Sequence, residues 1–200
     1  MPSGDPDRVA WLLVSVSAGA DASLRVAIWR QLHKLGAVYL QNSVCLLPDV
    51  PLVAETIDLL VTRVRAGSGQ AQVLHLQLEA NDAEGIVAEQ RGERDGEYAE
   101  VVAPTTAFLD KIRSETMRGR ATYAEVEESE ADLARFDRWL ASICARDYFG
   151  APGGGAARAA VETCRDALAT FESAASRADS AAAPPPATPS TRLPSVPIKS

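Results

Sequence analysis

The order of apolar and polar residues predicts a strand followed by a helix at the start of the chain. Residues 9–17 read VAWLLVSVS, an apolar and β-branched run that predicts a buried strand. Apolar residues then recur at three- and four-residue spacing over residues 24–35, which predicts an amphipathic helix. Asp21 or Ser23 is suited to cap this helix, and Gly36 ends it.

The next forty residues repeat this alternation of strands and helix. Two apolar runs, residues 37–41 and 44–48, flank an Asn-Ser pair and predict a β-hairpin. The pattern predicts an amphipathic helix over residues 52–64 and an alternating, half-buried strand over residues 71–80. This order of elements is that of ferredoxin-like folds, in which two helices cover one face of an antiparallel sheet. We therefore expect a ferredoxin-like βαββαβ domain over residues 8–80.

Beyond this domain the composition shifts to charged residues that favour helices. Residues 81–178 are therefore expected to form a helical extension. Within it, residues 122–146 and the segment after GAPGGG carry apolar residues at helical spacing, which predicts a helical hairpin. Residues 179–200 are rich in proline and alanine, and they predict a disordered tail. The expected fold class is α+β.

Composition and charge narrow the classes of function. The 200 residues include 27 acids and 20 Lys or Arg residues, and the net charge of -7 opposes bulk attraction to nucleic acid or anionic lipid. Three cysteines do not make a disulfide framework. No apolar run is long enough to span a membrane, and the first residues lack the features of a signal peptide. We expect a cytoplasmic protein that has no membrane partner.

Basic and aromatic residues cluster on the first predicted helix. Arg25, Trp29 and His33 are spaced four apart and form a row, with Arg30 and Lys34 beside it. Such a cluster predicts a surface for the phosphates of promoter DNA or for a partner protein. The alternative is that Trp29 packs under the later helices while the basic side chains are solvated. No helix-turn-helix or zinc-finger pattern accompanies the row.

Three arginines are candidates for binding chromate or a sulfate-like oxyanion. Arg138 and Arg146 lie eight residues apart, close to one face of a helix, and Arg25 follows the loop SAGADAS at a helix start. Asp21 argues against an oxyanion site in this loop, because as a helix cap its carboxylate would accept the hydrogen bonds of the backbone amides that an oxyanion needs. Asp147 opposes the other site, and the alternative is that it pairs with an arginine to fix the interhelical loop.

The sequence gives little support for catalysis. Ser15 and Ser17 stand where metal nucleases of this fold need an acid at the end of the first strand. The two histidines and three cysteines lack the spacing of a zinc site, and no nucleophile and base pair can be assigned. We therefore predict no catalytic residue, no metal ligand and no cofactor.

Several segments together resemble the chromate-resistance protein ChrB family, in its N-terminal region. The segments are WLLVSVS, SLRVAIWRQLHKLGAVYLQNSVCLLP, TYAEVEESEADLARFDRWL and ARDYFGAP, and they cover roughly residues 9–172. The first domain also looks like the ferredoxin-like module of PaaX-type repressors. The resemblance implies a bacterial, cytoplasmic protein of chromate-resistance operons.

Two functions follow from this resemblance. The first is a chromate-responsive transcriptional regulator, or a partner-binding subunit of one. The alternative is an oxyanion-handling enzyme of the resistance pathway, either chromate-reducing or accessory. A homodimer is among the partners that the sequence leaves open.

Overall fold

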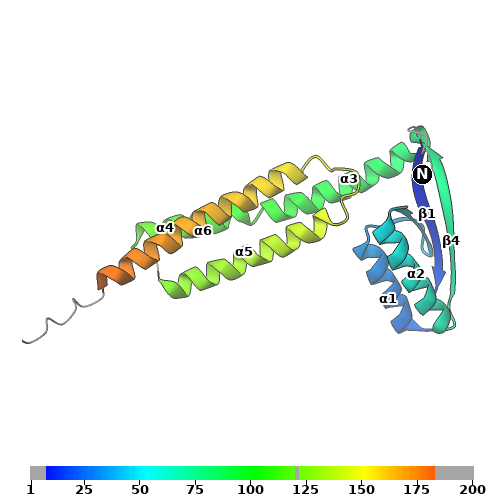
Figure 1. The fold of residues 1–200 in the computed structure, drawn as a ribbon, viewed down its shortest axis with the longest axis horizontal. Coiled ribbons are helices and arrows are strands. Elements are labelled where there is room, and N and C mark those ends of the chain that lie inside the picture. Colours follow the sequence, from blue (N-terminus) through cyan, green and yellow to red (C-terminus); the bar gives the residue numbers. More distant parts are fainter. Residues whose placement is uncertain (1–7, 120–121, 183–200) are drawn as a thin grey trace, which may run out of the picture.

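The computed structural model describes residues 8–119 and 122–182, and these form a sheet domain followed by a bundle of long helices (Figure 1). The sheet domain consists of β1 (Arg8–Ser17), α1 (Ala22–Lys34), β2 (Val38–Gln41), β3 (Val44–Pro48), α2 (Pro51–Ala66) and β4 (Gln70–Glu79). The bundle consists of α3 (Ala80–Val102), α4 (Thr105–Met117), α5 (Tyr123–Cys144) and α6 (Gly154–Ala182).

The four described strands form one antiparallel sheet in the order β2-β3-β1-β4. The central strand β1 pairs with β3 and β4, so that Val14 lies opposite Cys45 on one side and Val73 on the other. Helices α1 and α2 lie on the same face of this sheet (Figure 1). The α+β class is thereby confirmed, and the strand order is the one that two split βαβ units produce.

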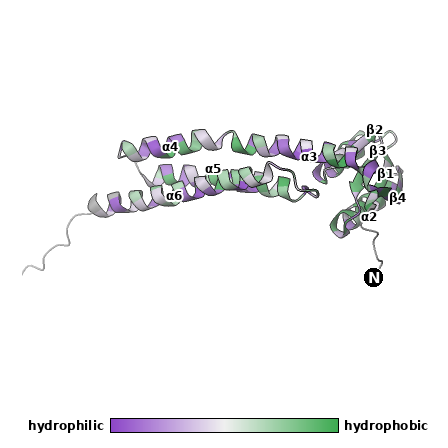
Figure 2. Ribbon diagram, turned by 90° about the horizontal axis from the view of Figure 1, so that it is seen from above, coloured by the Kyte–Doolittle hydropathy of each residue, from purple (hydrophilic) through white to green (hydrophobic). Residues whose placement is uncertain are grey.

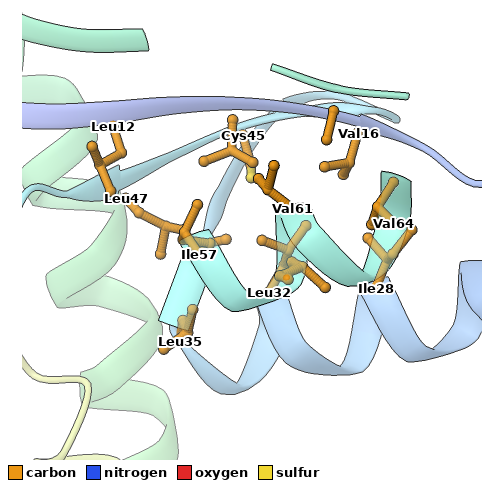
Figure 3. Packing of buried hydrophobic residues seen from close by; sticks show 14 of the residues in the cluster. Leu12, Val16, Ile28, Leu32, Leu35, Cys45, Leu47, Ile57, Val61 and Val64 are labelled. Atoms are coloured by element: carbon orange, nitrogen blue, oxygen red, sulfur yellow. The ribbon is translucent and has the colours of Figure 1, made fainter. Parts of the chain in front are cut away.

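The main core lies between this face and the two helices. Because side chains alternate along a strand, Leu12 and Val16 of β1 point toward the helices, where they are joined by Leu32, Ile57 and Val64 (Figure 3). Full burial of such a side chain stabilises the fold by about 1.5–3 kcal/mol. The helical spacing seen in the sequence therefore corresponds to the packed faces of α1 and α2.

The opposite face of the sheet is covered at one end by α3 and by the loop after α5. Trp11, which alternates with Leu12, is fully buried there, and its ring stacks on Phe149 with centroids 5.4 Å apart. Ala83 and Ile86 of α3 join this cluster. Helix α3 starts directly after β4, with no intervening loop, and runs from the sheet into the bundle (Figure 1).

The bundle has its own core. Buried side chains from all four of its helices meet there, and Phe108 of α4 contacts Phe136 of α5 edge to face at 5.8 Å. Helices α5 and α6 pack side by side, which agrees with the expected helical hairpin, and α3 and α4 follow one another alongside them (Figure 2). Polar residues alternate with apolar ones along each helix (Figure 2).

Helix α6 continues to Ala182, so residues 179–182 are helical, although the sequence assigned them to the tail. The rest of the predicted disordered tail, residues 183–200, lies outside the described residues. None of the helices in the described part of the chain is long and apolar enough to cross a membrane.

Candidate functional site

Trp29 lies on the surface of the sheet domain. Its side chain is 54% exposed, and its ring stacks on that of His33 with centroids 5.2 Å apart and planes 10° from parallel. The alternative in which Trp29 packs under the later helices is therefore wrong. A large exposed aromatic ring that is held in place by a neighbour is available to contact a partner.

The basic and aromatic residues of α1 form two neighbouring surfaces. With about 100° per residue, Arg25, Trp29 and His33 lie on the side of α1 that faces β2, and they line hollows there. Arg30 and Lys34 are exposed farther around the helix and line neither hollow. The predicted row of Arg25, Trp29 and His33 therefore lines the hollows, whereas Arg30 and Lys34 beside it do not.

Two hollows adjoin β2, which is an edge strand of the sheet. The first, which we call the α1–β2 hollow, has a volume of about 520 Å³ and is lined mainly by apolar side chains, with Arg25 at one end. The second, the α3 hollow, has a volume of about 390 Å³ and is lined by His33 and by four glutamates of α3, namely Glu89, Glu93, Glu97 and Glu100. Tyr39 of β2 lines both hollows, so they are neighbours along the strand.

Charge is distributed unevenly between the two parts of the chain. Residues 8–79 contain six Lys or Arg and five acids, whereas residues 80–182 contain twelve Lys or Arg and twenty acids. In the bundle most described cations are paired with acids: Arg94, Lys111, Arg113, Arg118, Arg135, Arg146 and Arg165. In the sheet domain, Arg25, Arg30, Lys34 and Arg63 form no ion pair with any described residue. Arg91, Arg138, Arg158 and Arg177 of the bundle also lack an ion pair with a described residue, but they lie among twenty acids, whereas the four on α1 and α2 lie in a part of the chain that has only five.

The loop before α1 is occupied by its own acid. Asp21 Oδ1 accepts hydrogen bonds from the Leu24 amide at 2.9 Å and from the Ser23 hydroxyl at 2.8 Å. These bonds, the backbone one first, lower the pKa of the Asp21 carboxyl. Arg25 donates to the Gly19 carbonyl at 3.0 Å. Asp21 therefore caps α1, as the sequence suggested, and a carboxylate stands where an oxyanion would bind.

Arg138 and Arg146 have different surroundings. Arg138 is exposed on α5 and has no hydrogen bond or ion pair with a described residue. Arg146, which lies just after α5, is 14% exposed, and its Nη2 lies 2.8 Å from Glu97 Oε2. The two arginines are therefore not joined by a shared partner, and Arg146 already has a carboxylate.

Asp147 forms no ion pair with an arginine that the structure describes, and its partners are other groups, so that expectation is wrong. The Tyr98 hydroxyl donates to Asp147 Oδ2 at 3.0 Å, and the Ala151 amide donates to its Oδ1 at 2.9 Å. Burial, and then the hydrogen bonds with Cys144 and Asp147, raise the pKa of Tyr98. Asp147 does fix the interhelical loop, but it does so through a tyrosine and a backbone amide.

The structure adds Arg94, which sequence reasoning missed. Its side chain is 4% exposed, with Nε 2.9 Å from Glu97 Oε2 and Nη2 3.0 Å from Glu93 Oε2. Its Nη1, like the Nε of Arg146, is buried without a hydrogen-bond acceptor. Arg94 and Arg146 therefore converge on Glu97 and retain donors that are not used.

This arginine pair lies where the sheet domain meets the bundle. Gln90 Nε2 donates to the Gly36 carbonyl at 2.7 Å, and the Tyr148 hydroxyl donates to the Leu35 carbonyl at 3.1 Å. The two residues that directly follow α1 are thereby bonded to α3 and to the loop after α5. A group that binds at Arg94 would lie against all three segments.

The described cysteines and histidines do not gather into a metal site. Burial raises the pKa of the Cys45 thiol to about 12 and also raises that of Cys164. His75 Nδ1 lies 2.7 Å from Asp49 Oδ2 on the exposed surface of the sheet domain. Within residues 8–119 and 122–182, no group of three or more His, Cys, Asp or Glu side chains could hold a metal ion.

Two comparisons with known proteins bear on this site. The model of the family described as "Protein ChrB, N-terminal" matches residues 25–181. The chain is also 30% identical over 160 residues to Protein ChrB of Cupriavidus metallidurans, an alignment that covers 78% of this chain and 44% of that protein. The chain thus spans less than half the length of this curated relative. Both matches show that the chain belongs to the chromate-resistance family of ChrB proteins and corresponds to their N-terminal region.

Proposed function

We propose that the chain works in chromate resistance as a chromate-responsive transcriptional regulator, or as the partner-binding subunit of one. Family membership links it to chromate resistance. The observation that carries the regulatory role is the set of cations in the sheet domain that have no acidic partner among the described residues. Such cations can bind a polyanion without first breaking an internal ion pair.

Arg30 and Lys34 are the residues that we assign to the contact with promoter DNA. Both are exposed on α1, and Arg63 of α2 lines a shallow hollow with Gln31 of α1 nearby. Lys and Arg side chains make many of the phosphate contacts in protein–DNA complexes, whereas the acidic residues of the bundle repel phosphates. The sheet domain, with its exposed helical layer, is therefore the part that would approach DNA.

The test replaces Arg30 and Lys34 together by alanine and measures binding to the operon promoter by fluorescence anisotropy. Loss of two phosphate contacts should weaken binding about tenfold or more at low salt and reduce the salt slope by about two. The matched control is Arg113→Ala with Arg118→Ala, which removes one exposed cation from α4 and one from the residue that follows it. Equal loss of affinity in both variants, or none in the first, would contradict a local DNA contact.

The chromate response is assigned to Arg146 together with Arg94. A tetrahedral dianion needs several charge-assisted donors that converge, and these two guanidinium groups meet at Glu97 with buried N–H groups to spare. The glutamates of the α3 hollow oppose an anion, so we expect weak binding. Arg138 lies two turns earlier on α5 and Arg25 at the opposite end of α1, so neither joins this pair.

Isothermal titration with chromate, with and without sulfate, tests this assignment. We expect weak, saturable heat that sulfate competes for and that Arg146→Ala abolishes, whereas Arg138→Ala retains it. Saturable heat that survives Arg146→Ala would place the site elsewhere. A parallel assay of chromate concentration with an added reductant separates the two functions, because an oxyanion-handling enzyme consumes chromate and a regulator does not.

A further inference from the structure

The surface along α1 and β2 has opposite charges at its two ends. Arg25, in the first turn of α1, forms no ion pair with a described residue, although its charge helps to lower the pKa of the nearby Asp21 carboxyl. At the other end, beyond His33, the exposed carboxylates of Glu89 and Glu100 have no partner among the described residues, and Glu93 lies between them on α3. An unpaired base and unpaired acids therefore stand at opposite ends of the same surface.

The middle of this surface is apolar and open to solvent. Val26 is 46% exposed, Trp29 54% and Tyr39 37%, and all three line the α1–β2 hollow. Exposed apolar groups that are grouped in this way, and flanked by charged groups, mark interaction surfaces on soluble proteins. We call the set formed by Arg25, Val26, Trp29, Tyr39, Glu89 and Glu100 the bipolar face.

The two kinds of charge on the bipolar face lie toward opposite ends of α1. Arg25 and His33 are eight residues apart on α1, which corresponds to about 12 Å, and the glutamates of α3 lie beyond His33. A two-fold axis perpendicular to α1 between Trp29 and His33 would bring the Arg25 end of one copy toward the glutamate end of another. Such an isologous contact forms every charge pair twice.

We propose that the bipolar face is the contact surface between two copies of this chain. DNA would be repelled by the glutamate end, and a partner of uniform charge would match one end and oppose the other. A second copy supplies both complementary ends at once and covers the apolar centre. The inference does not rest on the proposed DNA contact, because Arg30 and Lys34 lie outside this face.

Charge exchange between copies tests the proposal, with the full chain studied by sedimentation equilibrium at low salt. Arg25→Glu and Glu89→Arg should each raise the Kd of the dimer by about tenfold or more, since each places like charges opposite one another twice. Mixing the two variants should restore association as a heterodimer. The double variant Arg25→Glu, Glu89→Arg should restore the homodimer.

Matched controls carry the same changes of charge on the bundle. Arg177→Glu on α6 and Glu127→Arg on α5 should leave the Kd within about twofold, because neither residue lies on the bipolar face. Trp29→Ala should weaken the dimer without any change of charge, and circular dichroism verifies that each variant is folded. A chain that sediments as a monomer at all concentrations, or variants whose mixture fails to associate, would overturn the proposal. Control variants that raise the Kd of the dimer as much as Arg25→Glu and Glu89→Arg do would also overturn the proposal.

Discussion

Glu97 Oε2 lies 2.8 Å from Arg146 Nη2, and this ion pair joins the C-terminal half of α3 to the segment that follows α5. The same carboxylate oxygen lies 2.9 Å from Nε of the buried Arg94. One acid therefore balances two guanidinium groups at the junction between the sheet domain and the bundle. The following predictions concern this junction first and then the fold around it.

Removal of this carboxylate should destabilise the protein strongly. Glu97→Ala leaves the buried Arg94 without its closest acid, and breaking a buried pair in this way costs about 3 kcal/mol or more. Glu93→Ala removes a carboxylate that is 48% exposed, so its cost should stay below about 1 kcal/mol. Urea unfolding of both variants measures the difference. Equal costs would show that the arginines are balanced by other groups or by solvent.

Gly36 has two reasons to be glycine, and a substitution can separate them. Its φ is +72°, and a Cβ atom would lie 2.8 Å from Arg94 Nη1. Gly150 has a φ of +68° and open space around it. Gly150→Ala should therefore cost about 1–2 kcal/mol from backbone strain alone, whereas Gly36→Ala should cost clearly more in urea unfolding. Similar costs would mean that Arg94 moves aside freely.

The three cysteines should differ in reactivity toward a thiol reagent such as DTNB. Cys45 and Cys164 are buried with raised pKa values, whereas Cys144 is half-buried near the bundle surface. At pH 8 we expect one fast phase, which Cys144→Ser removes, followed by slow reaction of the other two thiols. Fast reaction of Cys45 would contradict its place in the core of the sheet domain.

Asp21 should make the stability of α1 depend on pH. Its pKa is lowered in the folded state, so its contribution is present above the unfolded pKa near 3.8 and is lost as pH falls through the folded value. Asp21→Ala should lower the melting temperature by a few degrees at pH 7, with a smaller difference from the unchanged protein at pH 3. Asp21→Asn, which can still cap the helix, should behave like the unchanged protein at pH 7. A difference that is constant with pH would show that Asp21 acts by some other means.

The sheet domain could be predicted because its signals are local. The alternation along β1, the spacing of Leu24, Ile28 and Leu32 on α1, and the cap at Asp21 each involve residues close in the sequence. The segments that cover the second face of the sheet could not be predicted in the same way. Trp11 points to the face opposite Leu12, and an apolar residue there indicates that another segment covers this face. The segments that do so, α3 and the loop with Phe149, are distant from Trp11 in the sequence.

The candidate site was harder to predict for the same reason. Residues 91–97 read RGERDGE and look like a solvated surface, yet Gln90 and Arg94 share helical spacing with the buried Tyr98 and Val101. That spacing was the available signal for the burial of Arg94. The acid that pairs with Arg146 is Glu97 of α3, and this pair could be found only by knowing which helices meet. Asp147, which is adjacent in the sequence, was therefore expected to pair with an arginine, and this was wrong.

The direct passage of β4 into α3 has a mechanical consequence. No linker separates Glu79 from Ala80, and α3 has 23 residues, so it acts as a stiff lever about 35 Å long. A tilt of about 5° where it leaves the sheet would displace its far end by about 3 Å. The hydrogen bond from Gln90 to the Gly36 carbonyl fixes α3 near its middle to the sheet domain. If the sheet changes its orientation, either this hydrogen bond must break or the whole bundle must move with the sheet.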